Sequence, residues 1–198
     1  MNSMSNPLRV LIVEDSEDDS LLVVHMLKKA GFDVSAERVE SVAAWNDALA
    51  RQTWDIVIAD YSVPGFGGLA ALELLKEKGE DIPFIIVSGT IIEETAVSAM
   101  KAGAHDYVMK GNIARLVPAV QRELQEAHVR QERRRAEEAL KQSEERYRAI
   151  FEFGGTALAF FEPDGRLLIC NRTFETLSGY PRCEAESLKN WSDFMLDA

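Results

Sequence analysis

The sequence predicts an α/β fold in which a five-stranded parallel sheet is covered by helices on both faces. Short β-branched runs alternate with amphipathic segments five times in about 125 residues. Such alternation implies right-handed crossovers and a parallel sheet between two helical layers. Several of the runs end in polar residues, and in a parallel sheet those ends share one edge.

The five strands are expected at the apolar runs 8–13, 33–39, 56–60, 83–88 and 105–109. The run that ends at Asp60 has four consecutive apolar residues, which indicates a strand buried on both faces. The run 33–39 is less apolar, so we expect it at an edge of the sheet.

The expected helices begin after Ser16 and Ser41, which can act as N-caps, and cover residues 69–78 and 93–102. Apolar spacing of three and four residues indicates the side that each helix turns to the core. The residues expected on that side are Leu22, Met26 and Ala30, with Val23 and Leu27 beside them, in the first helix, and Val42, Trp45 and Leu49 in the second.

From Asn112 the pattern predicts a single long helix with an apolar stripe up to Leu124. We therefore assign residues 1–7 to a tail, 8–125 to the α/β domain, and 126–146 to a highly charged helical linker. The linker is expected either to pair with a second copy as a coiled coil, giving a homodimer, or to stay a single solvated helix. Residues 147–198 contain two short strands and a short helix, too few residues for an independent core.

The composition limits the classes of partner. The formal net charge of −11 argues against nucleic acid or an anionic membrane as a partner of the whole surface. No apolar run has the length of a membrane span, and no signal peptide is evident. Cys170 and Cys183 have neither metal spacing nor the pattern of a disulfide framework, so we expect a reducing compartment and a cytoplasmic protein.

Complementary polar residues follow the strands at the shared edge: Glu14, Asp15, Asp60, Ser88 and Lys110. A carboxylate such as Asp60 can act as a nucleophile toward a phosphoryl group. Neighbouring acids would repel phosphate by themselves, but they become ligands when Mg²⁺ is bound. A lysine and a serine hydroxyl can then bind phosphoryl oxygens. The pattern predicts magnesium-assisted phosphoryl transfer to Asp60.

Residues 8 to about 125 resemble the receiver domain of two-component response regulators. The resemblance rests on the ordered set Glu14-Asp15, Asp60, Pro64-Gly65, Ser88-Gly89-Thr90, Tyr107 and Lys110. It implies a flavodoxin-like sheet of order 2-1-3-4-5 that is phosphorylated by a histidine kinase or a histidine phosphotransfer protein. Such a domain is a signalling module rather than an enzyme, although it catalyses its own phosphoryl uptake and release.

The resemblance also implies roles for the individual residues. Asp60 is the phosphoacceptor, and Asp15, Asp60 and the backbone carbonyl of Ser62 contact Mg²⁺, with Glu14 acting through water. Ser88 and Tyr107 form a switch pair that reshapes the face of the fourth helix, the fifth strand and the last helix. Two positions depart from the family pattern, because Gly111 stands where a proline is common and Val63 where a methionine is frequent. Ser62 and Thr90 occupy positions that tune phosphoryl lifetime in the family.

The end of the chain resembles the first half of a PAS sensor domain. The resemblance rests on residues 146–151, Glu162-Pro163-Asp164-Gly165, residues 170–174 and Gly179-Tyr180. It implies a partial α+β segment at 147–198. As a separate hypothesis, we expect phosphorylation at Asp60 to alter dimer packing through the face of the fourth helix and the linker.

Two other functions use the same residues. A magnesium-dependent phosphohydrolase with an aspartate nucleophile commonly carries an acid two residues later, where this chain has Ser62. A flavodoxin-like nucleotide-binding module needs a phosphate cradle after the first strand, where this chain has five acids among residues 14–19. Within that run we interpret Asp18 and Asp19 as helix-capping charges rather than ligands.

Overall fold

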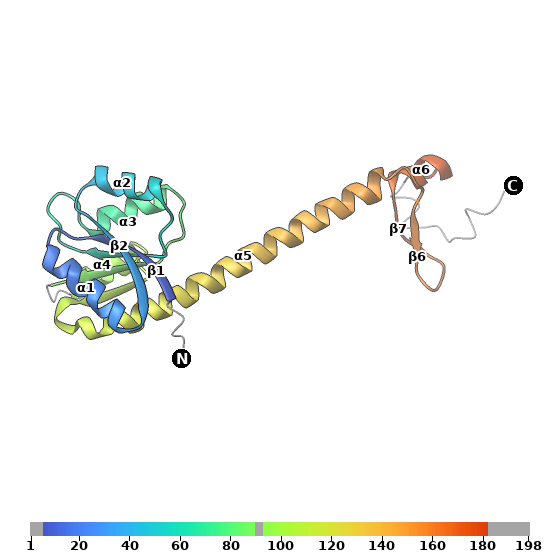
Figure 1. Cartoon of the computed structure of the whole chain (residues 1–198). Coiled ribbons are helices and arrows are strands. Elements are labelled where there is room, and N and C mark those ends of the chain that lie inside the picture. The colour runs from blue at the N-terminus through green and yellow to red at the C-terminus, as the bar shows by residue number, and fades with distance from the viewer. Residues whose placement is uncertain (1–5, 90–92, 182–198) are drawn as a thin grey trace. The chain divides into compact units, whose positions relative to one another are not determined.

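The computed structural model describes residues 6–89 and 93–181, and the chain divides into two compact units, residues 1–131 and 132–198 (Figure 1). The helices and strands of the first unit are β1 (Asn6–Val13), α1 (Glu17–Lys29), β2 (Phe32–Val39), α2 (Val42–Arg51), β3 (Ile56–Asp60), α3 (Gly68–Glu77), β4 (Phe84–Ser88), α4 (Glu93–Lys101), β5 (Asp106–Met109) and the 3-10 helix η1 (Lys110–Arg115). Helix α5 (Leu116–Phe153) begins in the first unit and ends in the second.

The sheet has five parallel strands in the order β2-β1-β3-β4-β5, which confirms the predicted doubly wound fold. As expected, β2 lies at an edge. Strand β3 lies in the centre, where Ile58 pairs with Ile12 on one side and with Ile85 on the other. All five residues of β3 are buried, as expected for a strand with helices on both faces.

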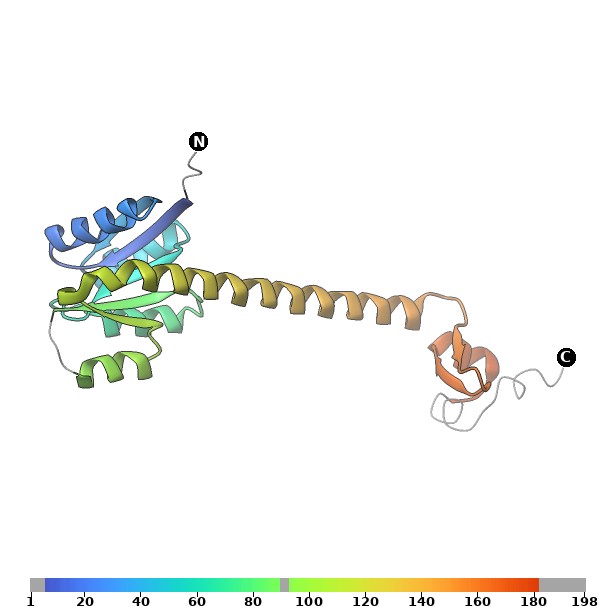
Figure 2. The same ribbon diagram turned by 90° about the horizontal axis from the view of Figure 1, so that it is seen from below.

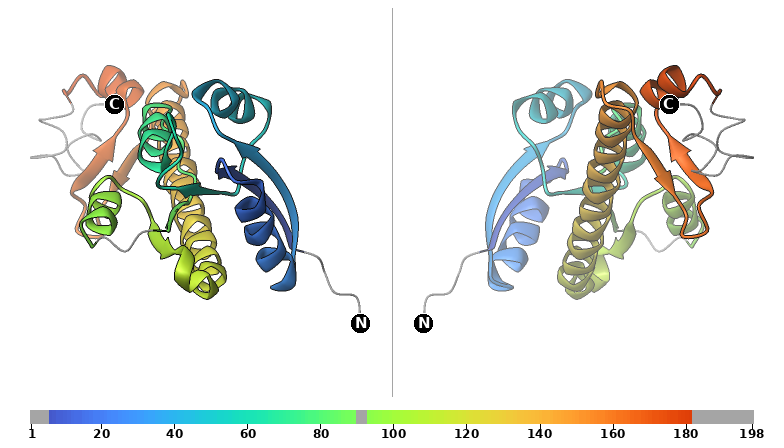
Figure 3. Two further views of the ribbon diagram at one scale, coloured as in Figure 1. Left: turned by 90° about the vertical axis from the view of Figure 1, so that its left-hand side faces the viewer. Right: turned by 90° about the vertical axis from the view of Figure 1, so that its right-hand side faces the viewer.

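The alternation of side chains along the strands produces two separate cores, and Figures 2 and 3 show the helices on both sides of the strands. One core contains Leu11, Val57 and Ile86 from the sheet and is covered by α2, α3 and α4. The other contains Val10, Ile58 and Ile85 and is covered by α1 and the start of α5. Each face of the sheet is thus closed by its own set of helices.

Three expected core positions are wrong. Ala30 is exposed and is the C-cap that follows α1. Leu22 of α1 is 47% exposed and Val42 of α2 is 45% exposed. Helix α1 instead buries Ser20, Val23 and Leu27. Residues 21–24 are all apolar, so the spacing alone did not define which side faces the sheet.

The connection after β5 also differs from the prediction of one helix from Asn112. The chain first forms η1, and Asn112 has non-helical backbone angles (φ −130°, ψ 46°), before α5 starts at Leu116. The expected stripe is present, since Leu116 and Val120 are buried and Leu124 packs against the same core. The kink sets Lys110 apart from the long helix that follows.

The second unit contains the antiparallel pair β6 (Ala159–Phe161) and β7 (Leu167–Cys170), followed by α6 (Arg172–Ser178). Asn171 is the N-cap of α6. Its buried side chain donates to the carbonyls of Phe151 and Thr156 and accepts from the amides of Leu158 and Phe174. The end of α5, the chain before β6 and the start of α6 are therefore joined by one residue.

Within residues 6–89 and 93–181, no helix has both the length and the apolar character needed to cross a membrane.

Candidate functional site

Two buried carboxylates mark the carboxyl edge of the sheet. Glu14 follows β1 and is 5% exposed, and Asp60 ends β3 and is 9% exposed. One carboxylate oxygen from each of Glu14, Asp15 and Asp60 lies within 4.8 Å of the other two. The structure therefore brings together the three acids that the sequence placed at neighbouring strand ends.

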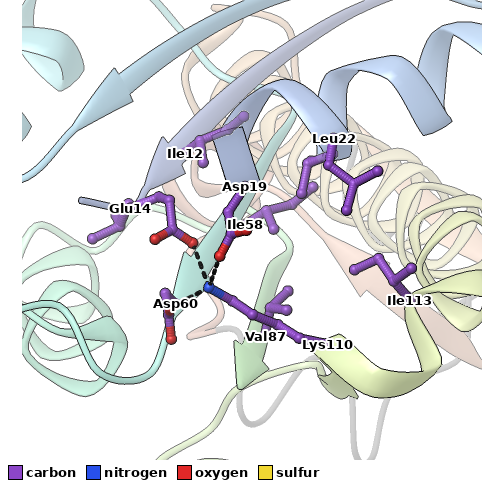
Figure 4. Close-up of a pocket in the computed structure, with 11 residues that line it drawn as sticks. Ile12, Glu14, Asp19, Leu22, Ile58, Asp60, Val87, Lys110 and Ile113 are labelled. Carbon is purple, nitrogen blue, oxygen red and sulfur yellow. Dashed lines mark hydrogen bonds and ion pairs between the residues drawn. The ribbon is translucent and has the colours of Figure 1, made fainter. Parts of the chain in front are cut away.

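Lys110 supplies the positive charge of this cluster. Its Nζ lies 2.5 Å from Asp60 Oδ2 and 2.9 Å from Glu14 Oε2, and it also forms an ion pair with Asp19 (Figure 4). Burial opposes the charge of Lys110, but the hydrogen bonds to Asp19, Asp60 and Glu14 raise its pKa above the ordinary value. Burial raises the pKa of Glu14, and the contact with Lys110 offsets that rise in part.

Backbone groups orient the two buried acids. The amide of Ser62 donates to Asp60 Oδ1 at 3.0 Å, and the amide of Ser16 donates to Glu14 Oε1 at 3.1 Å. The loop after Asp60 packs closely on the start of α3, where a Cβ on Gly67 would lie 2.4 Å from the Tyr61 carbonyl oxygen. A side chain at Gly67 would therefore displace the loop that carries Asp60.

Arg38, at the end of β2, braces the loop that carries the other two acids. Its Nη1 donates to the carbonyls of Glu14 at 2.9 Å and Asp15 at 3.2 Å, and to Glu40 Oε2 at 2.9 Å. The sequence interpretation missed Arg38. The expected strand order was the available signal, because it places the end of β2 beside the end of β1.

Asp19 is the second residue that the interpretation missed. The Asp19 amide donates a hydrogen bond to the capping oxygen Ser16 Oγ at 3.2 Å, as expected for the first turn of α1. The Asp19 carboxylate, however, binds Lys110. Asp19 therefore lies in the capped first turn, as expected, and in addition forms an ion pair with Lys110 that was not foreseen. The two residues are 91 positions apart, and no local pattern connects them.

The two expected switch residues lie on the neighbouring strands. Ser88 ends β4, is 1% exposed and pairs in register with Met109. Tyr107 of β5 is partly buried and packs against the core covered by α2, α3 and α4. Thr90 lies outside the described residues.

An apolar hollow of about 160 Å³ adjoins the charged cluster. Figure 4 shows Leu22, Ile58, Val87 and Ile113 around it, with Lys110 reaching from the η1 side toward the acids. The exposed position of Leu22, contrary to the expectation, places this side chain at the hollow rather than in the core.

The chemistry of the donor set fits magnesium. Three clustered carboxylates are hard oxygen ligands of the type that Mg²⁺ binds. A bound Mg²⁺ would neutralise negative charge on a phosphoryl group, and Lys110 offers a second cation at the same edge.

Comparison with known proteins decides the family. Residues 10–121, more than half of the chain, match the family described as "Response regulator receiver domain". The chain belongs to this family. Receiver domains of response regulators are two-component signalling modules rather than classical enzymes.

Known response regulators are similar to part of the chain. The nitrogen assimilation regulatory protein NtrX of Azorhizobium caulinodans is 32% identical over 126 residues, which are 62% of this chain and 27% of that protein. A chemotaxis protein CheY homolog of Campylobacter jejuni is 27% identical over 105 residues, 52% of this chain and 81% of that protein. The chain thus spans about a quarter of the length of the NtrX relative.

Solved structures agree with the sequence relatives. The crystal structure of the receiver domain of NtrX from Brucella abortus superposes with a TM-score of 0.53 at 28% identity and covers 59% of this chain and 98% of that domain. A longer NtrX structure from the same organism gives a TM-score of 0.57 at 27% identity, over 64% of this chain and 28% of that chain. Both matches support the receiver fold of the first unit.

Proposed function

We propose that the chain is a phosphorylation-controlled receiver in which Asp60 accepts a phosphoryl group, with Mg²⁺ bound, from a histidine kinase or a histidine phosphotransfer protein. The observation that carries the proposal is the position of Asp60. Its carboxylate is 9% exposed at the end of the central strand, clusters with Glu14 and Asp15, and lies 2.5 Å from Lys110 Nζ.

The side chains around Asp60 have distinct tasks in this reaction. A carboxylate oxygen of Asp60 attacks phosphorus, and the bond from phosphorus to the histidine nitrogen breaks, leaving its electron pair on the nitrogen. Asp15, Asp60 and the Ser62 carbonyl would hold Mg²⁺, with Glu14 acting through water. Lys110 and the Ser88 hydroxyl bind phosphoryl oxygens and stabilise the transferring charge.

We propose that the phosphoryl group then changes the surface formed by α4, β5 and α5. Ser88 moves toward the phosphoryl oxygens, and the Tyr107 ring turns further into the space beside it. The positions of the two residues support this order of events, since Ser88 ends the strand next to β3 and Tyr107 is already half-buried on the adjacent strand.

The output is proposed to pass through residues 126–146 as a helical linker to a partial PAS-like segment at 147–198, in a cytoplasmic homodimer. Large apolar side chains are exposed on α5 at positions that share one side of the helix, namely Val129, Leu140, Tyr147 and Ile150. Pairing of two α5 helices would cover these side chains.

The proposal is tested by measuring intact-protein mass after incubation with Mg²⁺ and acetyl phosphate, with wild type beside Asp60→Asn. One added phosphoryl group that requires Mg²⁺ and is lost in Asp60→Asn supports the receiver chemistry. An equal gain in Asp60→Asn contradicts it. Continuous hydrolysis of simple phosphoesters, lost in Asp60→Asn, would instead indicate the phosphohydrolase.

The homodimer is tested by sedimentation with and without beryllium fluoride as a phosphoryl mimic. Leu140→Glu combined with Ile150→Glu is expected to give a monomer, whereas Glu138→Gln, which leaves the apolar side of the helix intact, is expected to stay a dimer. A wild-type monomer in both conditions contradicts the dimer, and an unchanged dimer contradicts its control by phosphorylation.

A further inference from the structure

A carboxylate that is not among the family residues is part of the charged cluster. Asp19 lies in the first turn of α1, and its side chain forms an ion pair with Lys110. The cap from Ser16 Oγ to the Asp19 amide fixes the backbone from which this side chain extends. Asp19 is not one of the three acids whose oxygens converge on a common point.

Lys110 has no spare donor in this arrangement. An ammonium group has three N–H bonds, and Glu14, Asp19 and Asp60 each accept one contact from Nζ. A phosphoryl oxygen that binds Lys110 must therefore replace one of the three carboxylates. Glu14 and Asp60 contribute oxygens to the cluster suited to a metal, so they have another possible cation. Asp19 depends on Lys110 for its ion pair within the described residues.

We propose that Asp19 is a positioning residue that competes with the incoming phosphoryl group for Lys110 and thereby slows phosphoryl uptake from strongly anionic donors. The inference rests on the proposed function of Asp60. Two effects act in the same direction. Asp19 holds the ammonium that the phosphoryl oxygen needs, and it adds a negative charge at the entrance of a site that must admit an anion. Its 42% exposed side chain places it on the solvent side of the buried acids.

The test compares phosphorylation rates of Asp19→Asn and Asp18→Asn. Both variants remove one charge from the same turn of α1, but the Asp18 side chain is exposed and lies outside the Lys110 cluster. With acetyl phosphate and Mg²⁺, Asp19→Asn is expected to be phosphorylated about three to five times faster than wild type, the size of a partly exposed charge interaction. Asp18→Asn is expected to change the rate by less than about 1.5-fold.

Two further measurements separate this role from a structural one. Phosphoramidate carries less negative charge than acetyl phosphate, so the acceleration in Asp19→Asn should be smaller with phosphoramidate. Asp19→Glu retains the charge and should restore a rate close to that of wild type. Calorimetric titration of Mg²⁺-loaded protein with beryllium fluoride should show tighter binding in Asp19→Asn by a similar factor, without any phosphoryl transfer.

The outcomes distinguish the inference from the function on which it rests. If wild type takes up no phosphoryl group while beryllium fluoride still binds more tightly to Asp19→Asn, the proposed function fails and the role of Asp19 toward Lys110 stands. If wild type is phosphorylated but Asp19→Asn is slower or unchanged, or Asp18→Asn is equally fast, the competition by Asp19 is refuted.

Discussion

The first unit, residues 1–131, buries an apolar layer on each face of a five-stranded sheet, whereas the second unit, residues 132–198, has two strands in its described part. The small core of the second unit contains Leu167 and Cys170, with a few partly buried neighbours. What joins its elements is the buried amide of Asn171. Apolar burial thus dominates the first unit, and one polar network dominates the described part of the second.

This contrast shows in which unit polar residues are available for a functional site and in which unit they are needed for stability. In the first unit the two cores determine the fold, so the charged residues at the carboxyl edge can be arranged for chemistry rather than for stability. In the second unit a polar residue has a structural task, because two short strands bury too little apolar surface. The predictions below test this division, from the largest expected effect to the smallest.

Trp45→Ala should strongly destabilise the first unit. The Trp45 side chain is fully buried and packs edge-to-face on Phe66 with ring centroids 5.8 Å apart. Its loss should reduce the free energy of unfolding by about 3–5 kcal/mol, measured by urea denaturation. Val42→Ala in the same helix is the control, and its exposed side chain should cost less than about 0.5 kcal/mol. Equal effects of the two substitutions would contradict the assigned core.

Asn171→Ala should disrupt the second unit and leave the first intact. Four hydrogen bonds are lost from a buried side chain, at a cost of about 2–4 kcal/mol. Hydrogen exchange should show loss of protection at the amides of Leu158 and Phe174, with unchanged protection in β3. Asn171→Ser can still cap α6 and should retain protection at Phe174 only. Full protection of both amides in the alanine variant would disprove the structural role of the network.

Arg38→Ala should weaken Mg²⁺ binding about tenfold, because the loop of Glu14 and Asp15 loses its brace. The stability of the fold should change little, since Arg38 acts on loop carbonyls at the sheet edge. Calorimetric Mg²⁺ titration measures the affinity, and Arg51→Ala, which removes an exposed ion pair with Glu37, is the matched control. An unchanged affinity in Arg38→Ala would show that the loop holds its shape without the guanidinium.

His105 should produce the smallest effect, a change in the slope of stability with pH. Its Nδ1 accepts the Phe84 amide at 3.1 Å, and its Nε2 lies 3.3 Å from Arg130 Nη2. Burial and the nearby Arg130 charge lower the pKa of His105 below its ordinary value. Between the lowered and the ordinary pKa, the unfolded chain binds more protons, so stability falls as the pH is lowered through that interval.

His105→Asn keeps a hydrogen-bond acceptor but does not titrate in this interval. The free energy of unfolding of the first unit, measured by urea denaturation between pH 7 and pH 5, should therefore fall less in His105→Asn than in wild type. A slope equal to that of wild type would assign the pH dependence to other groups.

The fold could be predicted from the sequence because its signals are local. The four apolar residues before Asp60 indicated a buried strand, and the alternation of strands and helices determined on which edge the polar residues meet. The same reasoning failed for the side of α1 that faces the sheet, since consecutive apolar residues at 21–24 fit more than one orientation. Side chains of a strand alternate strictly between two faces, so the sequence leaves few choices for which residues face the core. A helix with several apolar residues per turn can be oriented in more than one way.

The details of the charged cluster could not be predicted in the same way. The contacts of Lys110 with Asp19 and of Arg38 with the Glu14 carbonyl join residues distant in sequence. They depend on the direction of long side chains, which leaves no periodic pattern in the sequence. The sequence thus predicted which residue types would meet at the sheet edge, but not which of them would pair.

The central position of β3 has a consequence for how a chemical event at Asp60 can be transmitted. Pairing on both sides fixes this strand in register, and a shift by one residue would turn every side chain to the opposite face. Asp60 is therefore attached to a strand that is held by a neighbouring strand on each side. If Asp60 is modified, we expect the resulting displacement in the loops and side chains that approach it from other strands, and not in β3.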